Sequence, residues 1–358
     1  MGSFRVDLGA NAHPVETGAG LLDRLGALAL AAGLTAGRAV IVTDDNVARL
    51  YGARAATALA AAGFSAIVIE VAAGEASKSI ATLGALYDRM VAAQLDRSSV
   101  VFALGGGVVG DLAGFAAATY LRGIAVVQVP TTMTAQVDSA LGGKTGVNHP
   151  AAKNLIGAFH QPRLIVADIV TLATLPEREF REGLAEVIKY GAIMDAPMIA
   201  GLEAAMPAIL RRDPARLAEI VDQSLRHKAA VVQRDEREGG LRKILNFGHT
   251  IGHALEASAG YGSYFHGEAV AIGMAAAAAL SRAHSGLGAA DAARLVRLIE
   301  AAGLPTRMPA GWRGEDFERA LRLDKKRARD GVEFVLLDRL GHALTRSLGF
   351  AEILAPFA

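Results

Sequence analysis

The order of apolar and polar residues divides the chain into two parts. In the first part, five short apolar runs rich in β-branched residues each end at a turn residue, and helix-like sequence lies between several of them. The runs span residues 39–44, 66–71, 99–104, 124–130 and 163–168. Such runs are typical of buried parallel strands, and their alternation with helices predicts a layered α/β domain. The last run, RLIVAD, also fits a position at the edge of the sheet.

After about Pro176 the apolar residues recur at helical spacing instead. Five stretches have this period, residues 177–194, 215–236, 248–260, 266–285 and 289–303, and only VEFVLLD has the pattern of a strand. We therefore predict an α/β fold with two domains: a Rossmann-like parallel-sheet domain over residues 1–176 and an all-helical domain over residues 177–358. A ligand is expected in the cleft between them.

Composition narrows the range of functions. The chain has 358 residues and no cysteine, which excludes disulfides and thiolate chemistry and leaves His, Asp and Glu as metal ligands. The net charge is +1 and the basic residues are scattered, which argues against a nucleic-acid surface. The N-terminus lacks the pattern of a signal peptide, and the apolar run GMAAAAALSRA is too short to cross a bilayer. We therefore expect no membrane association and a cytoplasmic location.

The sequence GGGVVGD directly follows the third predicted strand. Gly105, Gly107 and Gly110 match the G-x-G-x-x-G spacing that lets a backbone approach a pyrophosphate at a helix N-terminus. A tight strand-to-helix turn explains the same glycines, so this match alone leaves dinucleotide binding open. The acidic residue that could bind a ribose, Asp44, ends an earlier strand. Ribose binding by Asp44 requires a strand order that differs from the common dinucleotide-binding fingerprint.

A segment rich in hydroxyls and glycines follows the fourth predicted strand. It runs from Val129 to Asn154 and includes Lys144 and Lys153. We predict a long loop here. Such a loop is either solvated surface or, because long ordered loops are often functional, a site for a phosphate or carboxylate.

The stretch LNFGHTIGHA places His249 and His253 four residues apart, a spacing that puts both side chains on one face of a helix. The pair could bind one metal ion, or it could cap or pack. Thr250 stands where the zinc-protease motif has a glutamate, so water activation by that neighbour is not indicated.

Five blocks of the chain resemble the 3-dehydroquinate synthase family and occur in that family's order. They lie between about residues 39 and 275 and read GGGVVGD, VPTTMTAQVDSALGGKTGVN, GLAEVIKYG, DEREGGLRKILNFGHTIGHA and FHGEAVAIGM. The wider sugar-phosphate cyclases and the fold of the glycerol dehydrogenases share part of this pattern.

The resemblance implies an enzyme that converts 3-deoxy-D-arabino-heptulosonate 7-phosphate to 3-dehydroquinate and inorganic phosphate, the second step of the shikimate pathway. The implied route is a transient NAD-dependent oxidation, β-elimination of phosphate, re-reduction and an intramolecular aldol closure. NAD and one divalent cation, Zn²⁺ or Co²⁺, are the implied cofactors. The implied assembly is a homodimer.

The family's pattern also assigns roles to residues of this chain. It makes Glu186, His249 and His266 the metal ligands, although a helix ion pair with Lys189 explains Glu186 taken alone. The implied catalytic residues are Asp138, Lys189, Glu238 and His253. The implied substrate contacts are Arg122 (from a partner subunit), Asp138, Lys144, Asn154, Lys189, Lys228, Arg242, Asn246, His253 and one of Lys325 and Lys326. The implied NAD contacts are Asp44, Asn46, Gly74, Glu75, Lys78, Gly106, Gly107, Val108, Val109, Gly110, Asp111, Thr131, Thr132, Lys144, Lys153, Thr171, Leu172, Ala173, Thr174 and Glu179.

Three other functions compete with this one. A cyclase that makes an inosose or a valiolone would keep NAD and the metal but would not need a carboxylate pocket, so Lys228 and Arg242 favour the keto acid. A polyol dehydrogenase on the same fold would accumulate NADH, which a cyclase does not. A non-enzymatic binding protein would not need five chemically coherent blocks.

Overall fold

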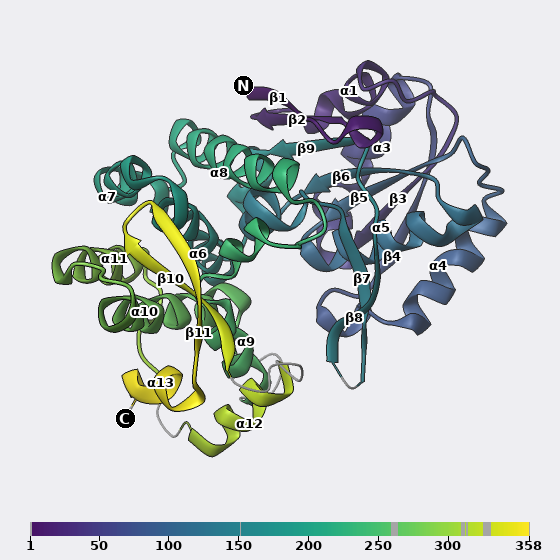
Figure 1. Cartoon of the computed structure of the whole chain (residues 1–358). Helices are drawn as coiled ribbons and strands as arrows, with labels where there is room; N and C mark the ends of the chain where they lie inside the picture. The colour runs from purple at the N-terminus through teal and green to yellow at the C-terminus, as the bar shows by residue number, and fades with distance from the viewer. Residues whose placement is uncertain are drawn as a thin grey trace. The chain divides into compact units, whose positions relative to one another are not determined.

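The five predicted strands all lie in one seven-stranded sheet (Figure 1). The computed structural model describes residues 2–150, 152–258, 264–308, 312, 314–324 and 331–357. The predicted strands are β3 (Arg38–Asp44), β4 (Ser65–Val71), β5 (Val100–Gly105), β6 (Ala125–Pro130) and β9 (Leu164–Asp168). The sheet order is β1-β2-β9-β6-β5-β3-β4, and neighbours among these five strands are parallel, as predicted.

Strand β9 is not at an edge of the sheet. The hairpin of β1 (Gly2–Val6) and β2 (His13–Gly18) extends the sheet beyond it, with β2 parallel to β9. The edge position considered for RLIVAD is therefore wrong. The first eighteen residues contain no long apolar run, so the extra strands left little signal in the sequence.

Alternate residues of the central strands face two separate cores. Ile41 and Phe102 lie in one core, and Val42 and Val101 lie in the other. Helices cover both faces, which is why the strands read as continuous apolar runs rather than as an alternating pattern. The first core includes residues of α1 (Leu25–Ala31) and α3 (Ala53–Ala61), and the second includes residues of α4 (Ile80–Ala92) and α5 (Gly107–Thr119).

The segment after β6 is not the one long loop that the sequence predicts. A π-helical turn, Ala135–Ser139, leads into an antiparallel hairpin of β7 (Lys144–His149) and β8 (Ala152–Phe159). Polar residues and glycines, Gly146 in β7 and Gly157 in β8, interrupt the apolar alternation that would mark these strands. At Gly157 glycine is required, because a Cβ there would lie 2.2 Å from the carbonyl oxygen of Thr145.

The second half of the chain is mainly helical, as predicted. Its helices are α6 (Glu177–Met194), α7 (Ala196–Leu210), α8 (Pro214–Arg234), α9 (His249–Ser258), α10 (His266–His284), α11 (Ala289–Ala301), α12 (Gly314–Asp324) and α13 (Phe350–Leu354). The predicted strand is β10 (Val332–Arg339), and it pairs with β11 (His342–Leu348). The all-helical description missed β11 because HALTRSL is a polar sequence.

Contacts within the chain define two compact units. The first comprises Met1–Leu175 and Leu217–Arg237, and the second comprises Pro176–Arg216 and Glu238–Ala358. A single boundary at residue 176 therefore does not describe both units, because most of α8 comes after that residue but belongs to the sheet unit. Polar contacts support that assignment, since Thr17 Oγ1 donates to Asp222 Oδ1 at 3.0 Å. Within the described parts of the chain, no helix is long and apolar enough to span a membrane.

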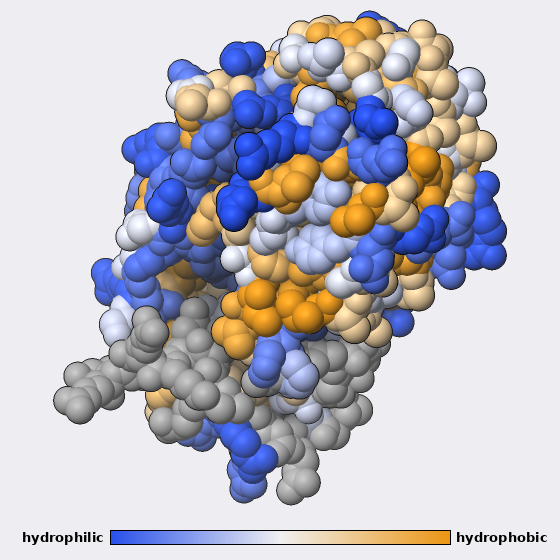
Figure 2. All heavy atoms as spheres, turned by 90° about the vertical axis from the view of Figure 1, so that its right-hand side faces the viewer, coloured by the Kyte–Doolittle hydropathy of each residue, from blue (hydrophilic) through white to orange (hydrophobic). Residues whose placement is uncertain are grey.

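Figure 2 shows one face of the molecule, on which apolar and polar residues are mixed in small groups. Several large apolar side chains of the first unit are exposed. They include Ile80, Val91, Leu121, Leu155 and Phe159, which are 53%, 63%, 41%, 62% and 46% exposed.

Candidate metal centre and cofactor-binding loops

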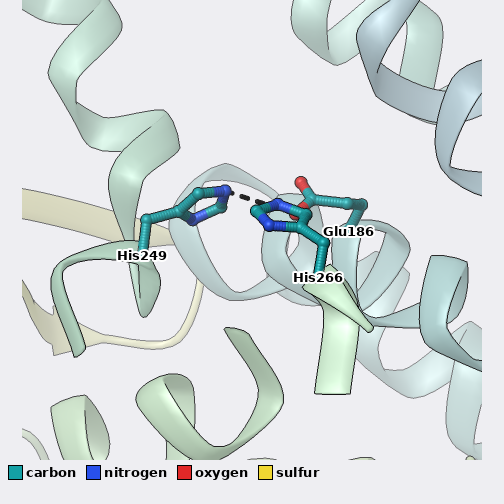
Figure 3. Close-up of side chains that lie close together, drawn as sticks. All are labelled: Glu186, His249 and His266. Carbon is teal, nitrogen blue, oxygen red and sulfur yellow. Dashed lines mark ion pairs between the residues drawn. The ribbon is translucent and has the colours of Figure 1, made fainter. Parts of the chain in front are cut away.

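Glu186, His249 and His266 approach one another from three different helices (Figure 3). Glu186 is in the middle of α6 and only 1% exposed, whereas His249 and His266 are the first residues of α9 and α10. Glu186 Oε1 is 3.4 Å from His249 Nε2 and 3.6 Å from His266 Nε2. One ligand atom from each residue thus lies within 4.8 Å of the others.

These distances fit a zinc-like cation. A tetrahedral Zn²⁺ with bonds of about 2.0–2.1 Å places neighbouring ligand atoms about 3.3 Å apart. The two measured separations from Glu186 Oε1 are close to that value. The Nδ1 atoms of both imidazoles face other acceptors, the Phe247 carbonyl for His249 and the Glu256 carboxylate for His266. Each Nε2 atom therefore faces the shared position and can bind a cation that displaces any proton there, and two histidines with one carboxylate leave coordination positions for substrate oxygens.

Glycines allow the helices that carry these residues to approach closely. A Cβ on Gly267, next to His266, would lie 1.8 Å from the carbonyl oxygen of Glu182 in α6. A Cβ on Gly273 would lie 1.9 Å from the carbonyl oxygen of Gly248, next to His249. The Gly267 amide also donates to Glu182 Oε2 at 2.9 Å. The glycines of the FHGEA and NFGHT blocks thus fix where both histidines lie.

Without a cation, His249 and His266 have very different pKa values. Burial lowers the pKa of His249 to about 3, against the attraction of Glu186. Burial alone would also lower the pKa of His266, but hydrogen bonds with Glu186 and Glu256 outweigh it and raise the pKa to about 10. At neutral pH His266 therefore carries the positive charge next to Glu186, and His249 stays neutral.

Lys189 and His253 lie next to this cluster. The helix ion pair between Lys189 and Glu186 is present, and both side chains are buried. It engages Glu186 Oε2, so Oε1 still faces the two histidines. His253 is exposed; its ring centroid is 5.4 Å from that of His249, and it groups with Glu256 and His266 rather than with Glu186.

Three more predicted site residues precede α9 in the same unit. Asn246 Nδ2 donates to Glu238 Oε1 at 3.2 Å, and Glu238 has a left-handed backbone with φ of 62°. Arg242 is only 2% exposed, an unusual burial for a guanidinium. Lys325 and Lys326 lie outside the described residues.

The first unit brings Asp138 and Lys228 together. Lys228 Nζ lies 3.0 Å from Asp138 Oδ2 and donates to the Asp138 carbonyl oxygen at 2.7 Å. Lys144 begins β7, and Asn154 in β8 has a φ of 54° and donates its backbone amide to Asn148 Oδ1 at 2.9 Å. Arg122 follows α5 with a φ of 68°.

The glycine loop and Asp44 lie on neighbouring strands. β5 is parallel to β3, and Leu104 pairs with Thr43. Asp44 and Gly105 therefore lie side by side at the carboxyl ends of adjacent strands. The strand next to the glycine loop thus comes earlier in the chain than the loop, and this is the difference from the common fingerprint that ribose binding by Asp44 requires. Asp44 also caps the next helix, accepting from the amides of Asn46 and Val47 at 3.0 Å.

Several other predicted NAD contacts lie around this edge. Lys78 Nζ is 2.6 Å from Asp111 Oδ2, and Glu75 Oε1 accepts from Asn148 Nδ2 at 2.7 Å. Burial raises the pKa of Asp111, although Lys78 opposes this. The residues from Gly107 to Asp111 form the first turns of α5, and Gly74 has a φ of 103°. Lys153 is in β8, and Glu179 is in the first turn of α6 in the second unit.

A glutamine that the sequence did not single out links the loop that contains Thr131 and Thr132 to the turn that contains Thr171. Gln136 is fully buried, and its Nε2 donates to the carbonyl oxygens of Pro130 and Asp168 at 3.1 and 2.9 Å and to Thr171 Oγ1 at 2.9 Å. It therefore ties the end of β6, where Thr131 and Thr132 lie, to the end of β9 and the turn Ile169–Thr174. Glu256 was missed in the same way, although it is only three residues after His253 on α9.

Models of the 3-dehydroquinate synthase family match most of the chain. The N-terminal model matches residues 68–182 and the C-terminal model matches residues 183–327. The chain is 52% identical over 341 residues to the 3-dehydroquinate synthase of Symbiobacterium thermophilum, with 95% of each chain covered. It is 50% identical over 348 residues to that of Pelotomaculum thermopropionicum, with 97% of this chain and 93% of the relative covered.

A solved structure agrees with these matches. The 2-epi-5-epi-valiolone synthase of Streptomyces hygroscopicus, with NAD⁺ and Zn²⁺ bound, gives a TM-score of 0.88 at 30% identity, with 96% of this chain and 95% of that chain covered. A glycerol dehydrogenase from Schizosaccharomyces pombe, at 19% identity and a TM-score of 0.66 with 95% and 86% covered, shares the fold. The chain belongs to the 3-dehydroquinate synthase family.

Proposed function

We propose that this protein converts 3-deoxy-D-arabino-heptulosonate 7-phosphate to 3-dehydroquinate and inorganic phosphate. The observation that carries the proposal is the convergence of Glu186, His249 and His266 at cation-binding distances in a chain of this family. When bound, NAD supplies a reversible hydride acceptor and the divalent cation supplies a Lewis acid.

The residues of the second unit hold and tune the cation site. Glu186, His249 and His266 are the ligands. Lys189 stabilises the ionised form of the Glu186 carboxylate by pairing with Oε2. His253 is exposed beside the cluster, where it can exchange a proton with a substrate oxygen. Glu238 and Asn246, which are hydrogen-bonded to each other, are assigned to a substrate hydroxyl and to the phosphate.

Positively charged side chains are assigned to the carboxylate and phosphate groups of the substrate. Arg242 and Lys228, 2% and 5% exposed, are assigned to the carboxylate, because cations that are already shielded from water bind a carboxylate more strongly than solvated ones. The family's pattern assigns Lys144, Asn154 and Asn246 to the phosphate. Asp138, held by Lys228, is assigned to a substrate hydroxyl.

The NAD assignment rests on the first unit. Asp44 for the ribose, the turn from Gly106 to Asp111 for the pyrophosphate, and the loops tied together by Gln136 lie at the carboxyl ends of neighbouring strands. This is where dinucleotides bind on parallel sheets.

A homodimer and a cytoplasmic location complete the proposal. The family's pattern assigns Arg122 to the phosphate of the substrate that is bound in the partner subunit, and this supports a dimer. The exposed apolar side chain of Leu121, the preceding residue, also supports it. The location is supported by a chemistry that draws on NAD and small phosphorylated metabolites.

A second candidate function is favoured by one observation, the close structural likeness to a valiolone synthase. A cyclase of that type acts on a substrate without a carboxylate. Burial of both Lys228 and Arg242 favours the keto acid instead.

One assay separates these functions. Zinc-loaded protein is incubated with the heptulosonate phosphate and NAD⁺ while inorganic phosphate and NADH absorbance are followed together. Phosphate release with no lasting NADH supports the proposal. Steady NADH without phosphate would indicate a polyol dehydrogenase. Phosphate release only from a sugar phosphate that lacks a carboxylate would indicate the other cyclase.

A further inference from the structure

Glu256 is a buried carboxylate that none of the assignments above uses. It lies two turns after His249 on α9 and is 8% exposed. Its Oε2 is 3.3 Å from His266 Nδ1 and forms a hydrogen bond with it. A carboxylate is rarely buried without a partner of opposite charge or a strong hydrogen-bond donor, and the imidazole supplies that partner.

The His266 ring is held between two carboxylates. Glu186 on α6 faces Nε2 at 3.6 Å, and Glu256 on α9 faces Nδ1 at 3.3 Å. A neutral imidazole carries a hydrogen on only one of its nitrogens. When a cation takes the place of the Nε2 proton, the hydrogen that remains is the one that Glu256 accepts at Nδ1, and the Nε2 lone pair is directed at the position shared with Glu186 and His249.

The two candidate histidine ligands have different hydrogen-bond acceptors at Nδ1. His249 Nδ1 faces the neutral Phe247 carbonyl at 3.2 Å, whereas His266 Nδ1 faces a carboxylate. A charged acceptor makes the stronger hydrogen bond and makes the opposite nitrogen a better electron donor. His266 is also the more exposed ligand, with a side chain 36% exposed against 12% for His249. It therefore depends more on a specific partner for its orientation.

We propose that Glu256 is a positioning residue that fixes the tautomer and orientation of His266 and so strengthens cation binding by Glu186, His249 and His266. This rests on the cation site of the proposed function but not on the reaction assigned to it. Glu256 does not touch the cation itself.

The test measures Zn²⁺ affinity and stoichiometry by competition with a chromophoric chelator, with no substrate or NAD present. Glu256→Gln is expected to weaken Zn²⁺ binding by about 10- to 100-fold, the usual effect of losing such a partner. Glu256→Asp keeps the charge and is expected to recover part of the affinity. Glu203→Gln is the matched control, because Glu203 pairs with Arg294 at 2.7 Å elsewhere in the same unit; it should leave the affinity unchanged.

A spectroscopic readout separates positioning from loss of structure. The absorption spectrum of bound Co²⁺ should shift in Glu256→Gln and not in Glu203→Gln. An unchanged Zn²⁺ affinity in Glu256→Gln overturns the proposal. So does loss of a second Zn²⁺ equivalent with the first one unaffected, because Glu256 would then be a direct ligand together with His253. If the reaction assay fails while these shifts occur, the proposed reaction is wrong and the role of Glu256 stands.

Discussion

Lys228 and Asp138, far apart in the sequence, are joined twice: Lys228 Nζ is 3.0 Å from the Asp138 carboxylate and 2.7 Å from its carbonyl oxygen. The contact is made within the sheet unit, because most of α8 belongs to that unit. It holds the buried ammonium group of Lys228 next to Asp138, and both residues are assigned to the substrate.

Replacing Lys228 with Met should lower kcat/KM for the heptulosonate phosphate by roughly 10- to 100-fold, because a charge-assisted hydrogen bond contributes about 1.5–3 kcal/mol. Zn²⁺ affinity should not change. Steady-state kinetics and chelator competition measure the two effects.

Arg226→Met is the control for Lys228→Met. Arg226 is on the same helix, two residues earlier, and its 2.7 Å ion pair with Asp222 is partly exposed. Its loss should change kcat/KM little. Equal losses in the two variants would remove Lys228 from the substrate site.

Replacing Gly273 with Ala should destabilise the protein by about 1–3 kcal/mol or more, the cost of overpacking. The new Cβ would meet the Gly248 carbonyl oxygen at 1.9 Å and push apart the helices that carry His249 and His266. Zn²⁺ affinity should therefore fall as well. Urea unfolding and metal titration test both effects.

Gly201→Ala is the matched substitution for Gly273→Ala. Gly201 lies in α7 of the same unit, and apart from the neighbouring backbone of that helix no described atom lies within 4 Å of the place where an alanine Cβ would be. The change should stabilise the protein by up to about 1 kcal/mol, because Ala favours helix over Gly. If Gly273→Ala behaved like Gly201→Ala, the close helix crossing would be incorrect.

The cation-free protein should lose stability as the pH rises. The pKa of His266 is raised from 6.5 to about 10 in the folded chain. A raised pKa gives stability that is fully present below 6.5 and is lost as the pH rises through about 10. The free energy of unfolding, measured in urea with a chelator present, should therefore fall over this range.

The variant His266→Gln isolates the pH effect. It removes the titrating group, so the difference in unfolding free energy between the two proteins should shrink from pH 6.5 toward about 10. A difference that stays constant over that range would show that His266 does not titrate as described.

The repetitive parts of the fold could be predicted from the sequence. Strands with both faces buried, such as the one that carries Ile41 and Val42, leave continuous apolar runs, and α6 leaves a clear helical period. The hairpins were harder. Strands β7 and β11 are held by hydrogen bonds to a partner strand, and glycine or polar residues conceal their pattern.

The candidate site was predicted only through the resemblance to a family. Spacing along α9 paired His249 with His253, whereas the structure places His249 with Glu186 and His266 from other helices. Residues that act through others left still less signal. Glu256 and Gln136 have no motif of their own, and their importance lies in hydrogen bonds that only the folded chain makes.

Glu186, His249 and His266 are expected to bind one divalent cation together. Diffraction from crystals of the Zn²⁺-loaded protein, collected on both sides of the zinc absorption edge, tests it directly. We expect one anomalous peak per chain, about 2.0–2.2 Å from Glu186 Oε1 and from the Nε2 atoms of both histidines. A zinc ion bound by His253 and Glu256 without Glu186 would show that the three residues do not form the cation site. The absence of a peak near these residues would show the same.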